Sequence, residues 1–294
     1  MLITFLLLGI AICAAWLKPV PVTAKFAFHP WLLVFAVSII SGVFTNILTL
    51  PAVLALVIFT GSAYLVVRPK APRTQRVLFG AATMLIALAL AMHKLPGFNN
   101  PILIADARFS ADAAAFKQYA NFDKGAVGLV LLAFLCKRST SLTELGEVLR
   151  RALPVAGLTI ALVMATAIPL GYLQPDFKLP AYTPVFLLAN LFLTCIAEEA
   201  FFRGFLQDRL SRLLKKLKWG GLFAALFCAV LFGLAHMGGG MSLVLLATIG
   251  GIGYGYAYHI TKKIEAAIAV HFLLNAAHFI FFTYPCLQGC GIKA

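Results

Sequence analysis

The sequence predicts an all-α protein, a polytopic bundle of about 8–10 membrane-spanning helices. Of its 294 residues, 62% are hydrophobic and only 12% are charged, and the mean hydropathy is +0.96. The apolar residues form long uncharged runs that short basic clusters separate. A soluble globular domain does not carry this much apolar sequence, and a disordered chain carries far more charge. The composition therefore excludes both classes and indicates an integral membrane protein.

The expected spans are uncharged runs bounded by charged residues, proline or glycine. A helix needs roughly 20 apolar residues to cross the hydrocarbon layer, and fewer where neighbouring helices or thin lipid allow it. In chain order the runs cover residues 2–16, 31–46, 52–67, 77–92, 125–136, 154–172, 182–202, 220–236, 241–259 and 264–282.

The distribution of Lys and Arg predicts the orientation of the chain in the membrane. There are 24 Lys and Arg against 10 Asp and Glu, a formal net charge of +14. Most of the basic residues fall in alternate loops on one side, as in the cluster Lys215, Lys216 and Lys218. Basic loops remain in the cytoplasm and contact anionic lipid headgroups. We therefore expect a multi-pass protein of an inner or plasma membrane, with membrane lipid and not nucleic acid as the partner of its positive charge.

Three polar segments outside the spans are expected to have structures of their own. Residues 94–124 are predicted to form an outer loop that caps the helix ends, with one or two amphipathic helical turns at residues 111–119. On the inner side, segments 141–151 and 205–218 have charged residues on one face and Leu or Val on the other, which is typical of interfacial helices.

The six cysteines show no metal-binding spacing. Four of them lie singly within apolar runs, where a thiol behaves as a small hydrophobic group. Cys286 and Cys290 lie four positions apart in the predicted outer tail, and an oxidising outer compartment would permit a disulfide between them.

Ionisable side chains within the predicted spans concentrate in the second half of the chain. Each one costs several kcal/mol inside a bilayer, so its presence there requires a reason. Three of the later spans contain them: Glu198, Glu199 and Arg203 in one, His236 four residues after Phe232 in the next, and His271 with Asn275 in the last.

Helical geometry assigns different roles to the two adjacent glutamates. Residues four positions apart stack on one helix face, whereas adjacent residues point about 100° apart. Glu199 and Arg203 are therefore expected to form a buried ion pair that neutralises both charges. Glu198 is left free to face a cavity, and His271 and Asn275 share one face of their own helix.

These side chains are the components of a hydrolytic site. A carboxylate beside a histidine in a desolvated pocket can deprotonate a water molecule, which assigns this role to Glu198 and His236. His271 and Asn275 can donate hydrogen bonds to the oxyanion that forms when water attacks a carbonyl. The sequence lacks a Ser or Cys nucleophile next to a base, and it lacks the His-Glu-x-x-His helix of zinc proteases. No cofactor is expected. The alternative is a catalytic zinc held by Glu198, His236 and His271.

Three motifs in this region resemble those of the CAAX protease and bacteriocin-processing family, which includes the type II prenyl-protein endopeptidases of the Ras-converting kind. They are Glu-Glu-x-x-x-Arg at residues 198–203, Phe-x-x-x-His at 232–236 and His-x-x-x-Asn at 271–275. The resemblance implies an intramembrane endopeptidase in which residues 125–294 form the catalytic core and residues 1–124 form additional helices. It also implies a peptide or membrane-protein substrate, with or without an attached lipid.

The depth of the site requires a longer helix than the apolar run around Glu198 provides. If Glu198 lay near the cytoplasmic end of its span and His236 near the outer end of the next, a full bilayer would separate them. We therefore expect the glutamate helix to continue beyond Arg203 for about ten residues, to Leu213, which places Glu198 at mid-depth. With a rise of about 1.5 Å per residue, the motif at 271–275 lies roughly 11–17 Å from the cytoplasmic end of its helix, at a matching depth.

Two other classes of function are compatible with a polytopic bundle. A non-catalytic member of the same family, acting as an immunity protein or as a scaffold for a membrane partner, would have the same helices and could have the same motifs. A transporter also places paired charges near mid-membrane, but transporters commonly contain inverted repeats, and this sequence shows no internal repeat. The complete set of candidate catalytic residues favours the protease.

Overall fold

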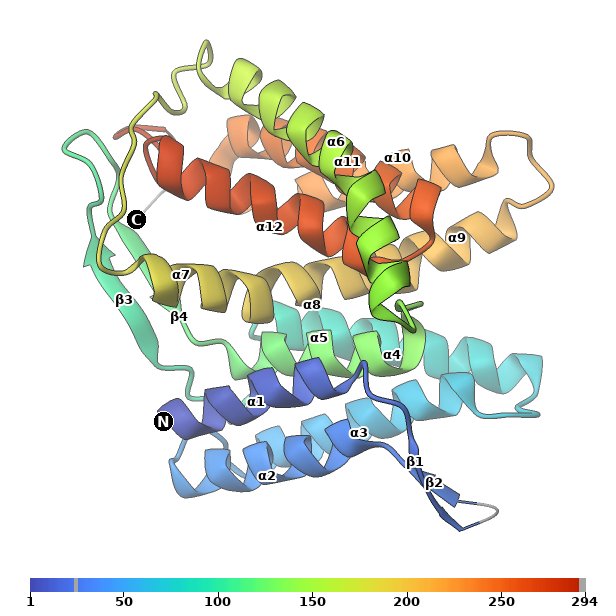
Figure 1. Cartoon of the computed structure of the whole chain (residues 1–294). Coiled ribbons are helices and arrows are strands. Elements are labelled where there is room, and N and C mark those ends of the chain that lie inside the picture. Colours follow the sequence, from blue (N-terminus) through green and yellow to red (C-terminus); the bar gives the residue numbers. More distant parts are fainter. Residues whose placement is uncertain (24–25, 291–294) are drawn as a thin grey trace. The chain divides into compact units, whose positions relative to one another are not determined.

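Helices dominate the structure, a computed structural model that describes residues 1–23 and 26–290 (Figure 1). The strands form two small antiparallel hairpins, so the predicted all-α class is confirmed. The contacts within the chain divide it into two compact units. Unit 1 comprises Met1–Pro101, Ala120–Cys136 and Phe192–Phe201, and unit 2 comprises Ile102–Tyr119, Lys137–Leu191 and Phe202–Ala294.

The helices confirm an integral, multi-pass membrane protein. In the part of the chain that the structure describes, six helices are long and apolar enough to cross a membrane, and three shorter apolar helices accompany them. The six are Leu50–Val67, Arg73–Ala91, Leu142–Ala167, Thr183–Leu213, Met237–Thr261 and Ile264–Phe281, and the shorter three are Leu2–Ala14, Pro30–Phe44 and Gly220–Leu234.

Unit 1 contains the first five helices of the chain, α1 (Leu2–Ala14), α2 (Pro30–Phe44), α3 (Leu50–Val67), α4 (Arg73–Ala91) and α5 (Phe122–Leu135). A hairpin of β1 (Val20–Thr23) and β2 (Phe26–Phe28) joins α1 to α2. Helix α5 is buried over most of its length and packs against α1, α3 and α4. Its apolar residues surround the whole helix, and a helix of this kind belongs in the interior of a bundle.

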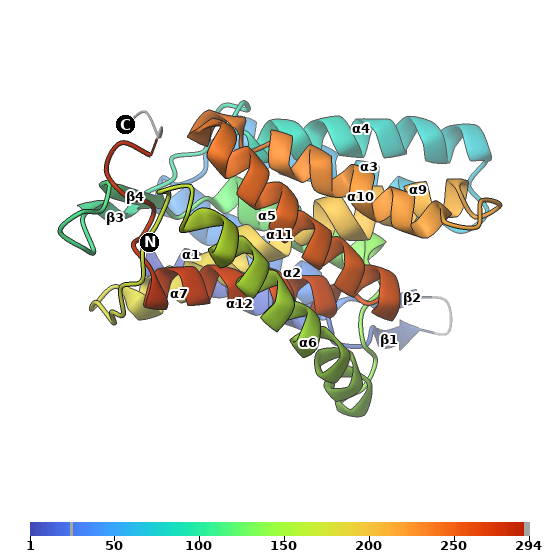
Figure 2. The ribbon, with the colours of Figure 1, turned by 90° about the horizontal axis from the view of Figure 1, so that it is seen from above.

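Unit 2 contains a second bundle, formed by α6 (Leu142–Ala167), α10 (Gly220–Leu234), α11 (Gly240–Thr261) and α12 (Ile264–Phe281). Helix α11 packs against each of the other three, and α6 also packs against α12 (Figure 2). Glycines permit the close approach. A Cβ atom on Gly233 of α10 would lie 2.7 Å from the Val244 carbonyl oxygen and 1.9 Å from the Thr248 hydroxyl of α11. Small residues at helix crossings are typical of membrane bundles.

A long helix, Thr183–Leu213, runs through the region that contains the two glutamates. It comprises three α-helical segments, α7 (Thr183–Asn190), α8 (Ile196–Glu199) and α9 (Asp208–Leu213), which are separated by the π-helical segments Leu191–Cys195 and Ala200–Gln207. The predicted continuation beyond Arg203 to Leu213 is therefore confirmed. The π-helical turns were not predicted, and such turns are frequent at functional sites.

Both predicted interfacial helices are wrong as separate elements. Residues 141–151 form the first turns of α6, where the Ser141 hydroxyl accepts a hydrogen bond from the Glu144 N–H at 3.1 Å. In segment 205–218, residues up to Leu213 belong to the long helix. Some of their polar side chains are covered by protein: Gln207 is buried, and its amide donates a hydrogen bond to the Gly255 carbonyl at 2.9 Å. A polar helix face that is covered by another helix has the same sequence pattern as one that faces water.

The predicted outer loop, residues 94–124, contains a β-hairpin and no helical turns at residues 111–119. Its strands are β3 (Ile102–Ala107) and β4 (Phe116–Tyr119), which pair antiparallel. The helical prediction fails because the apolar residues of this segment join a distant aromatic cluster in unit 2. The Phe116 ring lies 5.0 Å from the ring of Tyr284, near the end of the chain. Tertiary packing of this kind overrides local periodicity.

The predicted disulfide between Cys286 and Cys290 is present. The chain around it is attached to the outer hairpin of unit 2, because the Ala114 N–H donates a hydrogen bond to the Cys286 carbonyl at 2.9 Å. Disulfides of this kind are typical of oxidising compartments, and the orientation of the chain in the membrane stays a prediction.

Candidate active site

An aromatic cluster in unit 2 holds the two candidate histidines. Phe232, in the last turn of α10, lies with its ring centroid 4.7 Å from His236 and 5.7 Å from His271. His236 lies just beyond the end of α10, and His271 lies on α12. The structure thus brings together two residues that are 35 positions apart in the sequence. Phe232 contacts both histidines, and its supporting role in the site stays a prediction.

A hydrogen bond sets the orientation of the His236 ring. Its Nδ1 atom lies 2.7 Å from the Phe232 carbonyl oxygen, one helical turn earlier. A carbonyl oxygen only accepts hydrogen bonds, so Nδ1 carries the proton. In the neutral ring the lone pair then lies on Nε2, the nitrogen that can accept a proton.

Tyr254 of α11 belongs to the same aromatic cluster and contacts the rings of Phe232 and His271. Its ring stacks on the His271 ring at a centroid distance of 4.4 Å and an interplanar angle of 11°. Both side chains are buried, with 2% and 4% of their surface exposed. The stacking fixes the plane of the imidazole within a desolvated environment, which a donor to an oxyanion requires.

Arg203 lies under this cluster and is completely buried. Its guanidinium donates a hydrogen bond to the Gly251 carbonyl at 2.9 Å. Its Cζ atom lies 4.8 Å from the centroid of the Phe232 ring and 5.1 Å from that of Tyr254. At these distances the cation is attracted by the faces of both rings. Arg203 therefore connects the residues that orient the two histidines.

The guanidinium depends on a glycine for its place. A Cβ atom at Gly251 would lie 3.2 Å from Nη2 of Arg203 and 3.2 Å from the Cα atom of Ala229. The glycine-rich stretch of α11 therefore has a specific function in addition to close helix packing.

Asn275 lies one turn beyond His271 on α12, as the sequence predicts. Its amide donates a hydrogen bond to the Asn190 side-chain oxygen at 3.3 Å. Asn190 is the last residue of α7, directly before the first π-helical segment. The contact joins α12 to the long helix and fixes the orientation of the Asn275 amide.

Glu198 lies in unit 1 and forms an ion pair, so the prediction that it is free is wrong. The Lys124 ammonium lies 2.6 Å from Glu198 Oε1, and the exposed fractions of the two side chains are 18% and 16%. Lys124 was predicted to lie in the outer loop, but it is in the first turn of α5. Helices α5 and α8 approach closely because Gly128 of α5 lies opposite Ala197 of α8. A Cβ atom on Gly128 would lie 3.0 Å from the Ala197 Cα.

The residue before Lys124 anchors the start of α5. Asp123 is buried and accepts a hydrogen bond from the Asn100 amide at 3.0 Å, and its other oxygen lies 2.7 Å from His93 Nδ1. A backbone segment held by these contacts places Lys124 at a defined position on the helix. His93 thus contributes indirectly to the position of Lys124.

Glu199 is completely buried in α8, as is Arg203 in the π-helical segment that follows. Burial of both groups is what the predicted ion pair requires, and the pair itself stays a prediction. Among the described residues 1–23 and 26–290, no three His, Cys, Asp or Glu side chains form a group that could hold a metal ion. Because Glu198 lies in unit 1 and the two histidines lie in unit 2, the zinc alternative stays a prediction.

Sequence reasoning missed three residues of the site: Lys124, Asn190 and Tyr254. Two of them left a signal in the sequence. Asn190 is a polar residue within an apolar span, and Tyr254 is an aromatic residue among glycines. Lys124 left no such signal, because it adjoins a polar stretch and its partner is 74 positions away.

Comparison with protein families identifies the segment that contains both glutamates and both histidines. Residues 180–277 match the family described as type II CAAX prenyl endopeptidase Rce1-like. This region belongs to the CAAX protease family. Comparisons with curated proteins and with solved structures find no match.

The Rce1-like region begins just before the long helix and ends two residues after Asn275. It therefore includes every candidate that the motifs supplied, together with Asn190 and Tyr254. Lys124 lies outside it, as do α1–α6. The ion pair of Glu198 consequently involves a helix that the family comparison does not cover.

Proposed function

We propose that the protein is an intramembrane endopeptidase in which Glu198 and His236 activate water and His271 and Asn275 stabilise the oxyanion. The observation that carries this proposal is the Rce1-like match, which includes all four residues. The arrangement within unit 2 supports it, because the hydrogen bond of His236 leaves Nε2 as the proton acceptor. The stacked position of His271 gives a rigid donor.

The reaction is a direct hydrolysis. Water attacks the carbonyl carbon of the scissile peptide bond while one of its protons passes to the Glu198 carboxylate, and its other O–H donates a hydrogen bond to Nε2 of His236. The negative charge that develops on the carbonyl oxygen is stabilised by hydrogen bonds from His271 and Asn275. The carbon–nitrogen bond then breaks and the proton is delivered to the leaving amine, which yields a carboxylate and an amine. No cofactor enters this scheme.

The proposed substrate is a peptide or membrane protein whose cleavage site lies close to the membrane, with or without a lipid group. This class follows from the setting of the site, since Glu198 lies on one membrane-spanning helix and His271 on another. The proposed location is an inner or plasma membrane with the basic loops in the cytoplasm.

The test is cleavage of a quenched-fluorescence library of membrane peptides by purified protein in detergent. Wild type is compared with Glu198→Gln and His236→Ala, each with and without a chelator. Glu147→Gln is the matched control, because Glu147 is an exposed glutamate on α6. A general base contributes roughly 10²–10⁴-fold to the rate, and we expect losses of this size in both site variants and none in the control. Loss of wild-type activity with chelator, restored by zinc, would contradict the metal-free scheme.

A second candidate function is that of a non-catalytic scaffold or immunity protein. The observation that favours it is the ion pair with Lys124, which occupies one oxygen of the candidate base. If folded wild-type protein cleaves no peptide in the library, the endopeptidase proposal is refuted and this second function is supported.

A further inference from the structure

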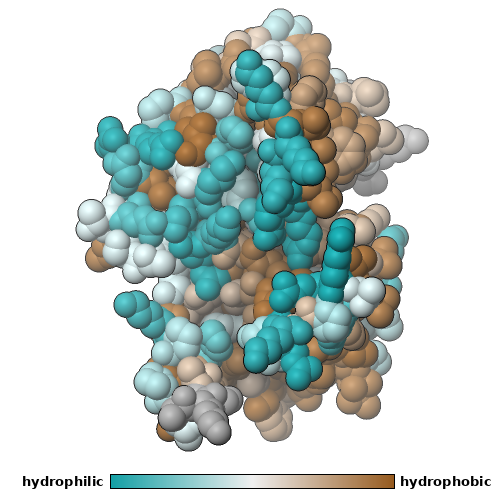
Figure 3. Space-filling view, turned by 90° about the vertical axis from the view of Figure 1, so that its right-hand side faces the viewer, coloured by the Kyte–Doolittle hydropathy of each residue, from teal (hydrophilic) through white to brown (hydrophobic). Residues whose placement is uncertain are grey.

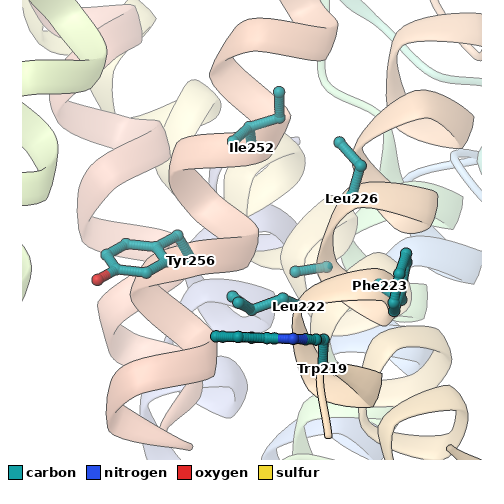
Figure 4. Close-up of a pocket in the computed structure, with 7 residues that line it drawn as sticks. Trp219, Leu222, Phe223, Leu226, Ile252 and Tyr256 are labelled. Carbon is teal, nitrogen blue, oxygen red and sulfur yellow. The ribbon is translucent and has the colours of Figure 1, made fainter. Parts of the chain in front are cut away.

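Unit 2 has an apolar groove on its surface, and none of the residues that line it takes part in the proposed hydrolysis. It lies between α10 and α11 and has a volume of about 290 Å³ (Figure 4). Six of its lining side chains are large and 37–58% exposed: Trp219, Leu222, Phe223, Leu226, Ile252 and Tyr256.

The groove extends along α10 from its first residues, next to the basic α9–α10 connection, toward the middle of the helix. Trp219 directly precedes α10, and Leu226 lies seven residues later on the same helix. With a rise of about 1.5 Å per residue, the groove spans roughly 10 Å along α10. Figure 4 shows the Trp219 indole extending from the start of α10 toward α11 at one end of the groove. Tryptophan at this position is typical of the boundary between headgroups and hydrocarbon.

Positive charge gathers at the Trp219 end. Lys215, Lys216 and Lys218 are exposed in the connection between α9 and α10, and the Lys218 ammonium lies 5.4 Å from the Trp219 ring. Residues 209–219 contain no Asp or Glu. Figure 3 looks onto the side where this connection lies in Figure 1, and hydrophilic residues gather on that face beside hydrophobic flanks.

We propose that the groove between α10 and α11 binds one phospholipid with an anionic headgroup. The acyl chain lies against Leu222, Leu226 and Ile252, and the phosphate contacts the three lysines of the α9–α10 connection. Charge complementarity selects this occupant, because an apolar groove alone accepts any acyl chain. Lysines near a membrane surface each add to the attraction for anionic lipid.

Quenching of Trp219 fluorescence by brominated lipids tests this proposal. The chain has three tryptophans, so a variant with Trp16→Phe and Trp31→Phe reports on Trp219 alone. This protein in phosphatidylcholine nanodiscs is compared with increasing fractions of brominated phosphatidylglycerol or brominated phosphatidylcholine. We expect half-maximal quenching at an about fivefold lower fraction of the anionic lipid.

Two charge variants separate a specific site from general attraction. Replacing Lys215, Lys216 and Lys218 with Gln should remove the preference for phosphatidylglycerol. The matched control replaces Arg68, Lys70 and Arg73, at the basic α3–α4 connection of unit 1, and should retain the preference. Native mass spectrometry of wild type and both triple variants, with bound phosphatidylglycerol counted, gives the same comparison if the tryptophan substitutions disturb folding.

Three outcomes would overturn the proposal. One is equal quenching by the two lipids in the parent protein. Another is equal loss of the preference in both triple variants, which would indicate diffuse attraction to the basic face. The third is protection of Trp219 from both lipids in a protein of dimeric mass, which would assign the groove to a second copy of the chain.

Discussion

Replacement of Arg203 by Lys should destabilise unit 2, although it keeps the charge. The guanidinium donates to the Gly251 carbonyl at 2.9 Å and lies over the rings of Phe232 and Tyr254. A hydrogen bond from a charged donor contributes about 1.5–3 kcal/mol, and each cation–π contact contributes about 0.5–2 kcal/mol. A lysine ammonium cannot reproduce the planar geometry. Because these contributions are not additive, we expect a net loss of about 2–4 kcal/mol in the free energy of unfolding.

Thermal unfolding in detergent measures this loss, and peptide cleavage measures its effect on the site. For a chain of this size, 2–4 kcal/mol corresponds to a fall in Tm of about 3–7 °C. The matched control is Arg212→Lys on the same long helix, where the arginine is exposed and pairs with Asp208 at 2.5 Å. The Arg212 side chain is 62% exposed and lysine keeps its charge beside Asp208, so the control should change little. A Tm for Arg203→Lys within 2 °C of the control variant's would refute the reasoning.

Two further predictions concern packing and pH. Gly233→Ala should destabilise the protein by about 1–3 kcal/mol, because the added methyl group would overlap α11. The control is Gly157→Ala, where the space around the glycine is open, and this variant should have an unchanged or higher Tm. The Ser110 hydroxyl and the Lys178 ammonium hold the pKa of Asp176 below its ordinary value of 3.8. The ionised Asp176 side chain therefore stabilises the fold above about pH 4, and this stabilisation is lost as the pH falls through the lowered pKa. Wild type should therefore exceed Asp176→Asn in Tm at pH 6, and the difference should shrink toward pH 3; a constant difference would contradict this assignment.

The helices of this protein could be predicted from the sequence because the bilayer imposes a local rule. Apolar runs such as 52–67 and 264–282 coincide with α3 and α12 to within two residues. The extension of the glutamate helix to Leu213 could also be predicted, since the candidate residues had to reach one depth. Local composition and a constraint on depth were sufficient for these elements.

The contacts of the site could be predicted only in part, because most of them are not local. The spacing of His271 and Asn275 gave their common helix face. In contrast, the ion pair of Glu198 with Lys124 depends on the approach of α5 to α8 at Gly128. No periodicity in either segment contains that information. The prediction of helical turns at residues 111–119 failed for the same reason, since Phe116 packs on an aromatic cluster formed largely by later residues.

The central claim is that the carboxylate of Glu198 takes a proton from the attacking water. The most direct measurement is single-turnover cleavage by Glu198→Gln, with binding of the same peptide measured separately by fluorescence anisotropy. Glutamine keeps the shape of the side chain and removes its capacity as a base. We expect a dissociation constant within about threefold of wild type and a cleavage rate lower by roughly 10²–10⁴-fold. A Glu198→Gln protein that cleaves bound peptide at the wild-type rate would contradict it.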